Sequence, residues 1–92
     1  MPLSDEELDH LERLSERCDP PPWRAVVEGR DHDSGDSFIQ VGNDGDRGED
    51  IYVTRDSGPA DASFLDLIAA ARTYLPKLIA EVRETRAASG QA

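Results

Sequence analysis

Two acidic stretches of the sequence carry residue types that can bind a metal ion. Their carboxylates are, in chain order, Asp31, Asp33, Asp36, Asp44, Asp46, Glu49 and Asp50. Calcium needs about six to eight oxygen ligands in a defined loop, and an EF-hand loop has glycine at its sixth position. Frames that start at Asp31 and Asp44 place Asp36 and Glu49 there instead. We therefore interpret both stretches as solvated turns, and a metal-binding or metal-dependent protein is our third hypothesis.

The histidines and the single cysteine give weak indications of catalysis. His10, His32 and Cys18 form no zinc-ligand set. Acidic neighbours could orient His32 as a base, but a loop histidine beside aspartate is more often incidental. Acidic neighbours of Cys18 disfavour a reactive thiolate, which favours a small core residue. The motifs G-x-S-x-G, G-x-x-x-x-G-K-[ST] and G-x-G-x-x-G are absent. We predict no catalytic residue, no metal ligand and no cofactor, and therefore no enzyme.

The charge of the chain limits its partners. The 92 residues include 20 acidic and 10 basic residues, a net charge of -10. This charge disfavours direct binding to nucleic acid or to an anionic membrane. The acidic surface over 28–50 could instead imitate nucleic-acid phosphates and inhibit a DNA-binding protein, which is our alternative hypothesis. An acidic N-terminus, one cysteine and no long apolar run predict a cytoplasmic protein.

The first predicted element is a helix over about residues 5–17. Ser4 and Glu7 have the capping-box spacing, and acidic residues in the first turn suit the positive end of the helix dipole. The prolines at 20–22 end the helix. Its apolar stripe repeats at spacings of three and four and consists of Leu8, Leu11, Leu14 (or Ser15) and Cys18.

Three short strands are predicted next, over 23–28, 38–41 and 51–54. The intervening segments 29–37 and 42–50 are rich in glycine, aspartate and asparagine, which are typical of turns. Consecutive short strands separated by turns predict an antiparallel meander. One face of the first strand is formed by Trp23, Ala25 and Val27.

The strongest pattern predicts a helix of about 25 residues from Ala62, capped by Asp61 or Ser57. Its apolar positions have spacings of 4, 3, 4, 3 and 4 and are Phe64, Ile68, Ala71, Leu75, Leu78 and Val82. This face is widened by Leu65, Leu67, Tyr74 and Ile79. The spacing passes through Pro76 unchanged, which favours one kinked helix over two. The heptad-like stripe could be a dimer seam or could pack on the protein's own sheet.

Two surfaces and one aromatic residue are candidates for binding a partner. Trp23, which follows three prolines, is either an exposed anchor or a core residue where the first helix meets the sheet. The candidate residues of the long helix are Leu75, Leu78 and Val82, and those of the acidic turn are Asp44, Asp46 and Asp50.

Two segments resemble small hypothetical proteins of phages and prophages from GC-rich bacteria, similar to the Ead-like accessory proteins of phage early regions. They are CDPPPWRAVV at 18–27 and LIAAARTYLPKLIAEVRETR at 67–86, with Pro22-Trp23 and Ala69-Ala70-Ala71-Arg72 before Pro76 as the shared features. The resemblance implies a short N-terminal helix, a Pro-Trp entry into a hairpin and a C-terminal helix. It implies a genomic context and no catalytic residues.

We therefore predict one α+β domain over residues 1–92, with frayed ends at 1–3 and 87–92. It comprises an N-terminal helix, a three-stranded antiparallel meander and a long kinked C-terminal helix. The expected function is that of a non-enzymatic accessory protein of phage type, which binds an unidentified protein partner and forms a homodimer.

Overall fold

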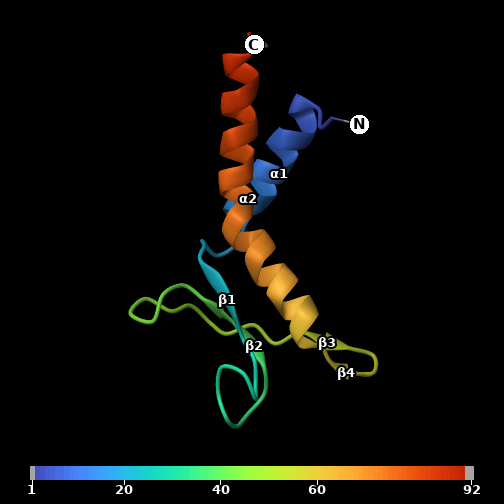
Figure 1. The fold of residues 1–92 in the computed structure, drawn as a ribbon, viewed down its shortest axis with the longest axis vertical. Helices are drawn as coiled ribbons and strands as arrows, with labels where there is room; N and C mark the ends of the chain where they lie inside the picture. Colours follow the sequence, from blue (N-terminus) through green and yellow to red (C-terminus); the bar gives the residue numbers. More distant parts are fainter. Residues whose placement is uncertain (1, 91–92) are drawn as a thin grey trace.

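A computed structural model describes residues 2–90, so the fraying expected at residues 1, 91 and 92 lies outside the described chain. The elements are α1 (Asp5–Arg17), β1 (Trp23–Val26), β2 (Phe38–Val41), β3 (Thr54–Arg55), β4 (Gly58–Pro59) and α2 (Ala62–Ala88). Figure 1 shows α2 as the long axis, with α1 beside its C-terminal half and the β1–β2 hairpin beside its N-terminal half. The predicted α+β class is confirmed.

Helix α1 has the predicted bounds, and its capping box is formed. The backbone N–H of Glu7 donates to the Ser4 hydroxyl oxygen at 3.0 Å, and the Ser4 N–H donates to the Glu7 carboxylate at 2.8 Å. These hydrogen bonds to Ser4 lower the pKa of Glu7. Cys18 leaves the helix in an extended conformation, before the three prolines.

The β1–β2 hairpin is antiparallel, with Trp23 opposite Val41 and Val26 opposite Phe38. Strand β1 ends two residues earlier than predicted. The reason is local, because side chains of the turn take the next two backbone donors. The Val27 N–H donates to Asp31 and the Glu28 N–H donates to the Ser37 hydroxyl oxygen.

The predicted third strand of the meander is wrong. The segment 51–54 meets β2 at one residue pair, in which Ile39 and Ile51 exchange backbone hydrogen bonds of 2.8 and 3.0 Å. The Val53 carbonyl then accepts from the Ala60 N–H, which turns the chain back on itself. Consequently β3 pairs with β4, and residues 2–90 contain two separate two-stranded sheets.

Helix α2 begins at the predicted cap, where the Asp61 carboxylate accepts from the Phe64 N–H at 3.0 Å. It continues to Ala88, two residues into the segment expected to be frayed. The prediction of one helix through Pro76 is confirmed. Proline cannot donate the backbone hydrogen bond to the Arg72 carbonyl, and Figure 1 shows the helix changing direction about midway.

The core lies between the hairpin and the first half of α2. Its buried members are Ala25, Ile39, Ala60, Leu65 and Ala69. Only part of the predicted apolar face of α2 is buried. Leu65 and Ile79 are buried and Ile68 packs against the core, whereas Phe64 and Leu78 of the heptad-like stripe are 39% and 56% exposed. The buried positions 65, 69 and 79 lie on the neighbouring stripe, where the hairpin and α1 both pack. Because one residue turns the helix by about 100°, the two stripes are adjacent.

Two consecutive residues of α2, Arg72 and Thr73, form hydrogen bonds to both α1 and β1. The Arg72 guanidinium donates to the Ser15 hydroxyl and carbonyl oxygens at 2.6 and 2.8 Å, and to the Asp19 carbonyl at 3.0 Å. The Trp23 N–H donates to the Thr73 hydroxyl oxygen at 3.0 Å, and that hydroxyl donates to the Trp23 carbonyl at 2.9 Å. The end of α1 and the start of β1 are therefore held at one level of α2.

Replacing Arg72 tests this junction. We expect Arg72→Ala to lower the free energy of unfolding by about 2 to 4 kcal/mol, because several hydrogen bonds from a charged group are lost and the hydroxyl of the buried Ser15 loses its partner. Chemical denaturation with circular dichroism measures the change. Arg83→Ala, which removes only exposed ion pairs from the same helix, is the matched control and should cost less. Equal losses would contradict the role of Arg72.

Candidate functional site

The fold leaves one side of a pair of helices uncovered. We call α1 together with residues 76–88 of α2 the helical arm. The two helices of the arm pack through the buried side chains of Leu8 and Ile79. Along one flank, Arg83 contacts Asp9 at 2.8 Å and Arg86 contacts Asp5 at 2.8 Å. We call this the sealed flank, because ion pairs cover the join between the helices.

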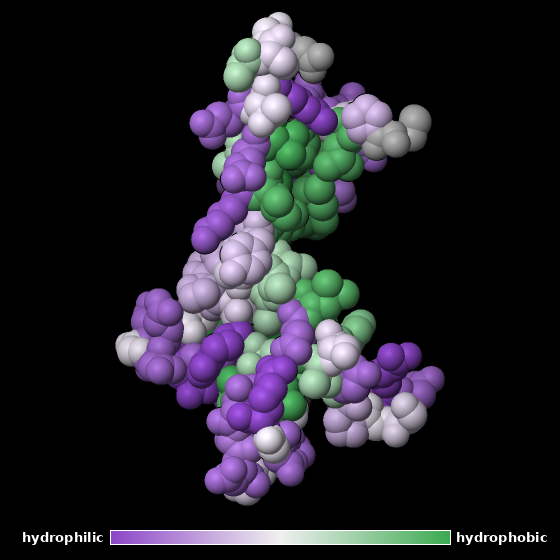
Figure 2. Space-filling model, viewed as in Figure 1, coloured by the Kyte–Doolittle hydropathy of each residue, from purple (hydrophilic) through white to green (hydrophobic). Residues whose placement is uncertain are grey.

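The opposite flank of the arm, which we call the open flank, is apolar. Figure 2 shows hydrophobic atoms gathered between α1 and the upper half of α2. Leu78 is 56% and Leu14 43% exposed. A shallow hollow of about 270 Å³ is lined by Leu78, Glu81, Val82, Thr85 and Arg86. The residues of the open flank are Leu11 and Leu14 of α1 and Leu75, Leu78 and Val82 of α2.

The predicted candidates of the long helix therefore come together on this flank, with Leu75 and Val82 half-buried beside the exposed Leu78. Sequence reasoning did not place Leu11 and Leu14 beside them. Leu11 follows the buried Leu8 by three residues and Leu14 follows Leu11 by three, which places them successively along one side of α1. Exposed apolar residues also continue down α2, at Tyr74 and at Leu67, which is 65% exposed.

The first acidic stretch serves the fold. Asp31 accepts from the Val27 N–H at 2.8 Å and from Arg30 Nε at 3.0 Å. Arg30 also donates two hydrogen bonds, at 2.9 and 3.0 Å, to the carboxylate of Asp66 on α2. The hydrogen bonds from Arg30 lower the pKa of Asp66, and the hydrogen bond from Val27 is the largest cause that lowers the pKa of Asp31. These carboxylates therefore fix the turn after β1 to α2.

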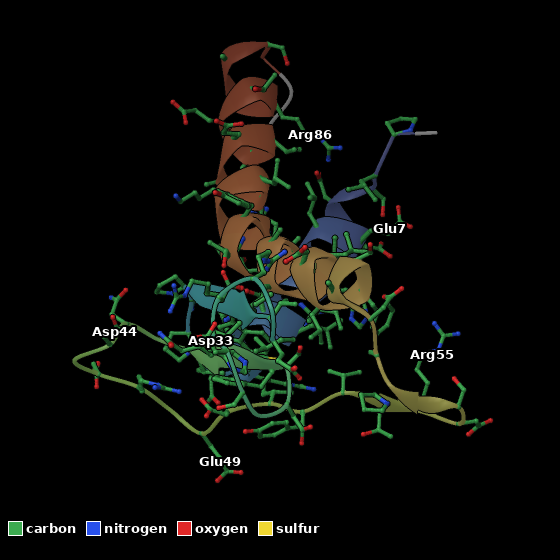
Figure 3. The ribbon with its side chains drawn as sticks, turned by 60° about the horizontal axis from the view of Figure 1, so that its bottom comes forward. Glu7, Asp33, Asp44, Glu49, Arg55 and Arg86 are labelled. Atoms are coloured by element: carbon green, nitrogen blue, oxygen red, sulfur yellow. The ribbon has the colours of Figure 1, made fainter. Side chains whose placement is uncertain are left out.

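The carboxylates of the second acidic stretch do not point toward one common site. The Asp44 carboxylate accepts from Gln40 at 3.0 Å, and Asp50 pairs with Arg47 at 2.6 Å. Asp46 is exposed. Figure 3 shows Asp44 and Glu49 pointing away from one another. Within residues 2–90, no group of three or more histidine, cysteine, aspartate or glutamate residues is arranged to hold a metal ion.

The remaining candidates lie apart from one another. His32 Nδ1 lies 2.5 Å from the Ser34 carbonyl oxygen, and its ring lies 6.1 Å from that of Phe38. Cys18 is exposed at the end of α1, so the interpretation as a core residue is wrong. It lies outside the core because the helix ends before it. Trp23 is half-buried, its indole N–H donates to the Asp19 carbonyl, and the Arg72 guanidinium lies 5.8 Å from its ring centre. Its contacts are thus those of the helix–sheet junction.

The surroundings of Asp66 predict a dependence of stability on pH. A lowered pKa in the folded protein means that the charged carboxylate stabilises the fold above its ordinary pKa of about 4. This contribution is lost as the pH falls through the lowered value. We therefore expect Asp66→Asn to lower the melting temperature at pH 7, and the difference from wild type to disappear in strong acid.

Thermal melting followed by circular dichroism between pH 7 and strong acid measures this difference. Asp33→Asn is the matched control, because Asp33 is exposed and forms no ion pair in the described part of the chain. A pH-independent difference for Asp66→Asn would contradict the assignment to its charge.

The dispersed acidic side chains also predict the response to metal ions. We expect millimolar Ca²⁺ or Mg²⁺ to leave the melting temperature unchanged, because a ligand that binds the folded state raises it. Differential scanning calorimetry at constant ionic strength is the measurement. A rise of several degrees that Asp44→Asn or Asp50→Asn abolishes would restore the metal hypothesis.

Comparisons of this chain with protein-family models, with curated proteins and with solved structures gave no match. Neither of the helices described over residues 2–90 is both long enough and apolar enough to span a bilayer. Function is therefore inferred from the surfaces of this chain.

Proposed function

We propose that this protein is a non-enzymatic accessory protein that acts by binding protein, and that the open flank of the helical arm is its binding surface. The observation that carries the proposal is the exposure of Leu78 on α2 and Leu14 on α1, two helices in contact, together with the half-buried Leu11, Leu75 and Val82. Monomeric proteins seldom leave a large contiguous apolar patch open to water, and such patches mark interaction sites. The resemblance to small phage proteins is compatible with a role of this kind.

The composition of the open flank also favours a protein ligand. Leucine and valine side chains dominate it. Glu81 lies at its edge, as does Arg86, which also reaches Asp5 on α1. An apolar centre with a polar rim is the usual anatomy of a protein–protein interface. The hollow there holds about 270 Å³, slightly below the volume of most small-molecule sites.

The alternative, imitation of nucleic-acid phosphates, has less support from the acidic turn. A mimic needs regularly spaced free negative charges. Here Arg47 neutralises Asp50, and Gln40 engages Asp44. We therefore place the binding surface on the arm and keep the acidic turn as the comparison in the experiment.

The test is affinity capture with the purified protein as bait, at low and at high salt. The captured chains are quantified by mass spectrometry, including untagged copies of this chain. We expect wild type to retain a specific protein at high salt, because apolar contacts are not screened by ions. Leu78→Asp should lose it, and the triple variant Asp44→Asn, Asp46→Asn and Asp50→Asn should keep it.

The opposite pattern would overturn the proposal. Salt-sensitive capture that the triple variant loses and Leu78→Asp keeps would support imitation of phosphates. A captured set that is the same for wild type and Leu78→Asp would remove the open flank as a binding surface.

A further inference from the structure

We propose that the partner on the open flank is a second copy of this chain, packed antiparallel about a twofold axis near residue 79 of α2. The inference rests on the proposed function and names the occupant of the same surface. Two helical arms stacked in this way would form a four-helix layer, with the apolar side chains of both open flanks inside. The experiment below separates the failure of this inference from the failure of the proposed function.

The chain exposes more surface than a compact monomer of its size. Its accessible surface is 6786 Å². A folded monomer of 10.1 kDa is expected to expose about 5,300 Å². The excess of about 1,500 Å² is larger than the roughly 800 Å² that each partner buries in a stable complex. A second copy could thus cover the open flank and still leave part of the excess exposed.

The shape of the chain gives a second, related argument. Its radius of gyration is 16.2 Å, against about 12 Å for a compact domain of this length. Figure 1 shows the reason, because the arm extends away from the hairpins rather than folding over them. No other element of the described chain covers the open flank, so it is accessible to another molecule.

The charges near the open flank have both signs. An isologous interface joins one surface to itself and must therefore be self-complementary. Glu81 lines the hollow, and Lys77, four residues earlier and of opposite sign, is exposed on α2 with its Nζ 5.4 Å from the ring centre of Tyr74. In an antiparallel pair of α2 helices that cross near residue 79, Lys77 of one copy comes opposite Glu81 of the other. A surface with one sign of charge would repel its own copy.

The distribution of the remaining charge decides the direction of packing. Residues 28–50 include eight acidic and two basic residues, a net charge of -6. They lie in and around the hairpin, away from the tip of the arm. Antiparallel arms place these two acidic regions at opposite ends of the dimer, where their repulsion is weakest. On the arm, Asp5, Asp9 and Glu12 are already paired with arginines on the sealed flank.

The experiment measures the mass and the dissociation constant of the purified full-length chain by analytical ultracentrifugation. We expect a dimer of wild type, and a dissociation constant raised about a hundredfold or more by Leu78→Asp, because a charge would be buried in the interface. Leu67→Asp is the matched control on the same helix, since Leu67 is more exposed but lies outside the arm. It should leave the dimer intact, and circular dichroism should show both variants folded.

A pair of charge reversals tests the antiparallel register. Lys77→Glu and Glu81→Lys should each weaken the dimer about three- to tenfold, because each places like charges opposite one another twice. The double variant should restore the affinity of wild type. If the double variant instead bound its own copy more weakly than either single variant, the antiparallel register would be overturned.

A monomer at high micromolar concentration would overturn the second copy as occupant, as would equal effects of Leu67→Asp and Leu78→Asp. If such a monomer still captured another protein in a Leu78-dependent way, the proposed function would stand without the dimer. If such a monomer captured no other protein, both the dimer and the proposed function would be contradicted.

Discussion

The contacts of Arg72 and Thr73 with the preceding elements are the constraint on which the structure depends. Arg72 holds the end of α1, and Thr73 holds the first residue of β1, so one turn of α2 fixes both. The proline segment between these points spans a short distance and contributes no regular hydrogen-bonded element. Without this junction, α2 would be the main connection between the arm and the hairpin. Few apolar side chains of α2 are buried, namely Leu65, Ala69 and Ile79.

The arm has two unequal flanks because of the order of residues on α1. The acidic residues at positions 5, 9 and 12 meet arginines of α2 on one side, whereas leucines at 11 and 14 lie on the other. Exposed ion pairs contribute little free energy each, but they neutralise the acidic charge of α1. As a result, ion pairs cover the join between the two helices on one side, and apolar side chains line it on the other.

The acidic turns illustrate how the same residue type serves different ends. Asp31 and Asp66 share Arg30, which links the turn after β1 to α2 across 36 residues of sequence. Asp44 and Asp50 make only local contacts with Gln40 and Arg47. Clusters of aspartate in the sequence therefore became structural links in one loop and solvated side chains in the other.

The sequence by itself determined the local elements. The capping box at Ser4, the bounds of α1, strand β2 and the unbroken course of α2 through Pro76 all follow from short-range hydrogen bonding and spacing. Only the tertiary structure decided that residues 51–54 meet β2 at a single pair, because a long-range contact competes there with the turn closed by Ala60. It also decided which stripe of α2 is buried. Helical spacing makes a wide face of α2 apolar, and the positions of the hairpin and α1 bury Leu65, Ala69 and Ile79 while Phe64 and Leu78 of the heptad-like stripe stay exposed.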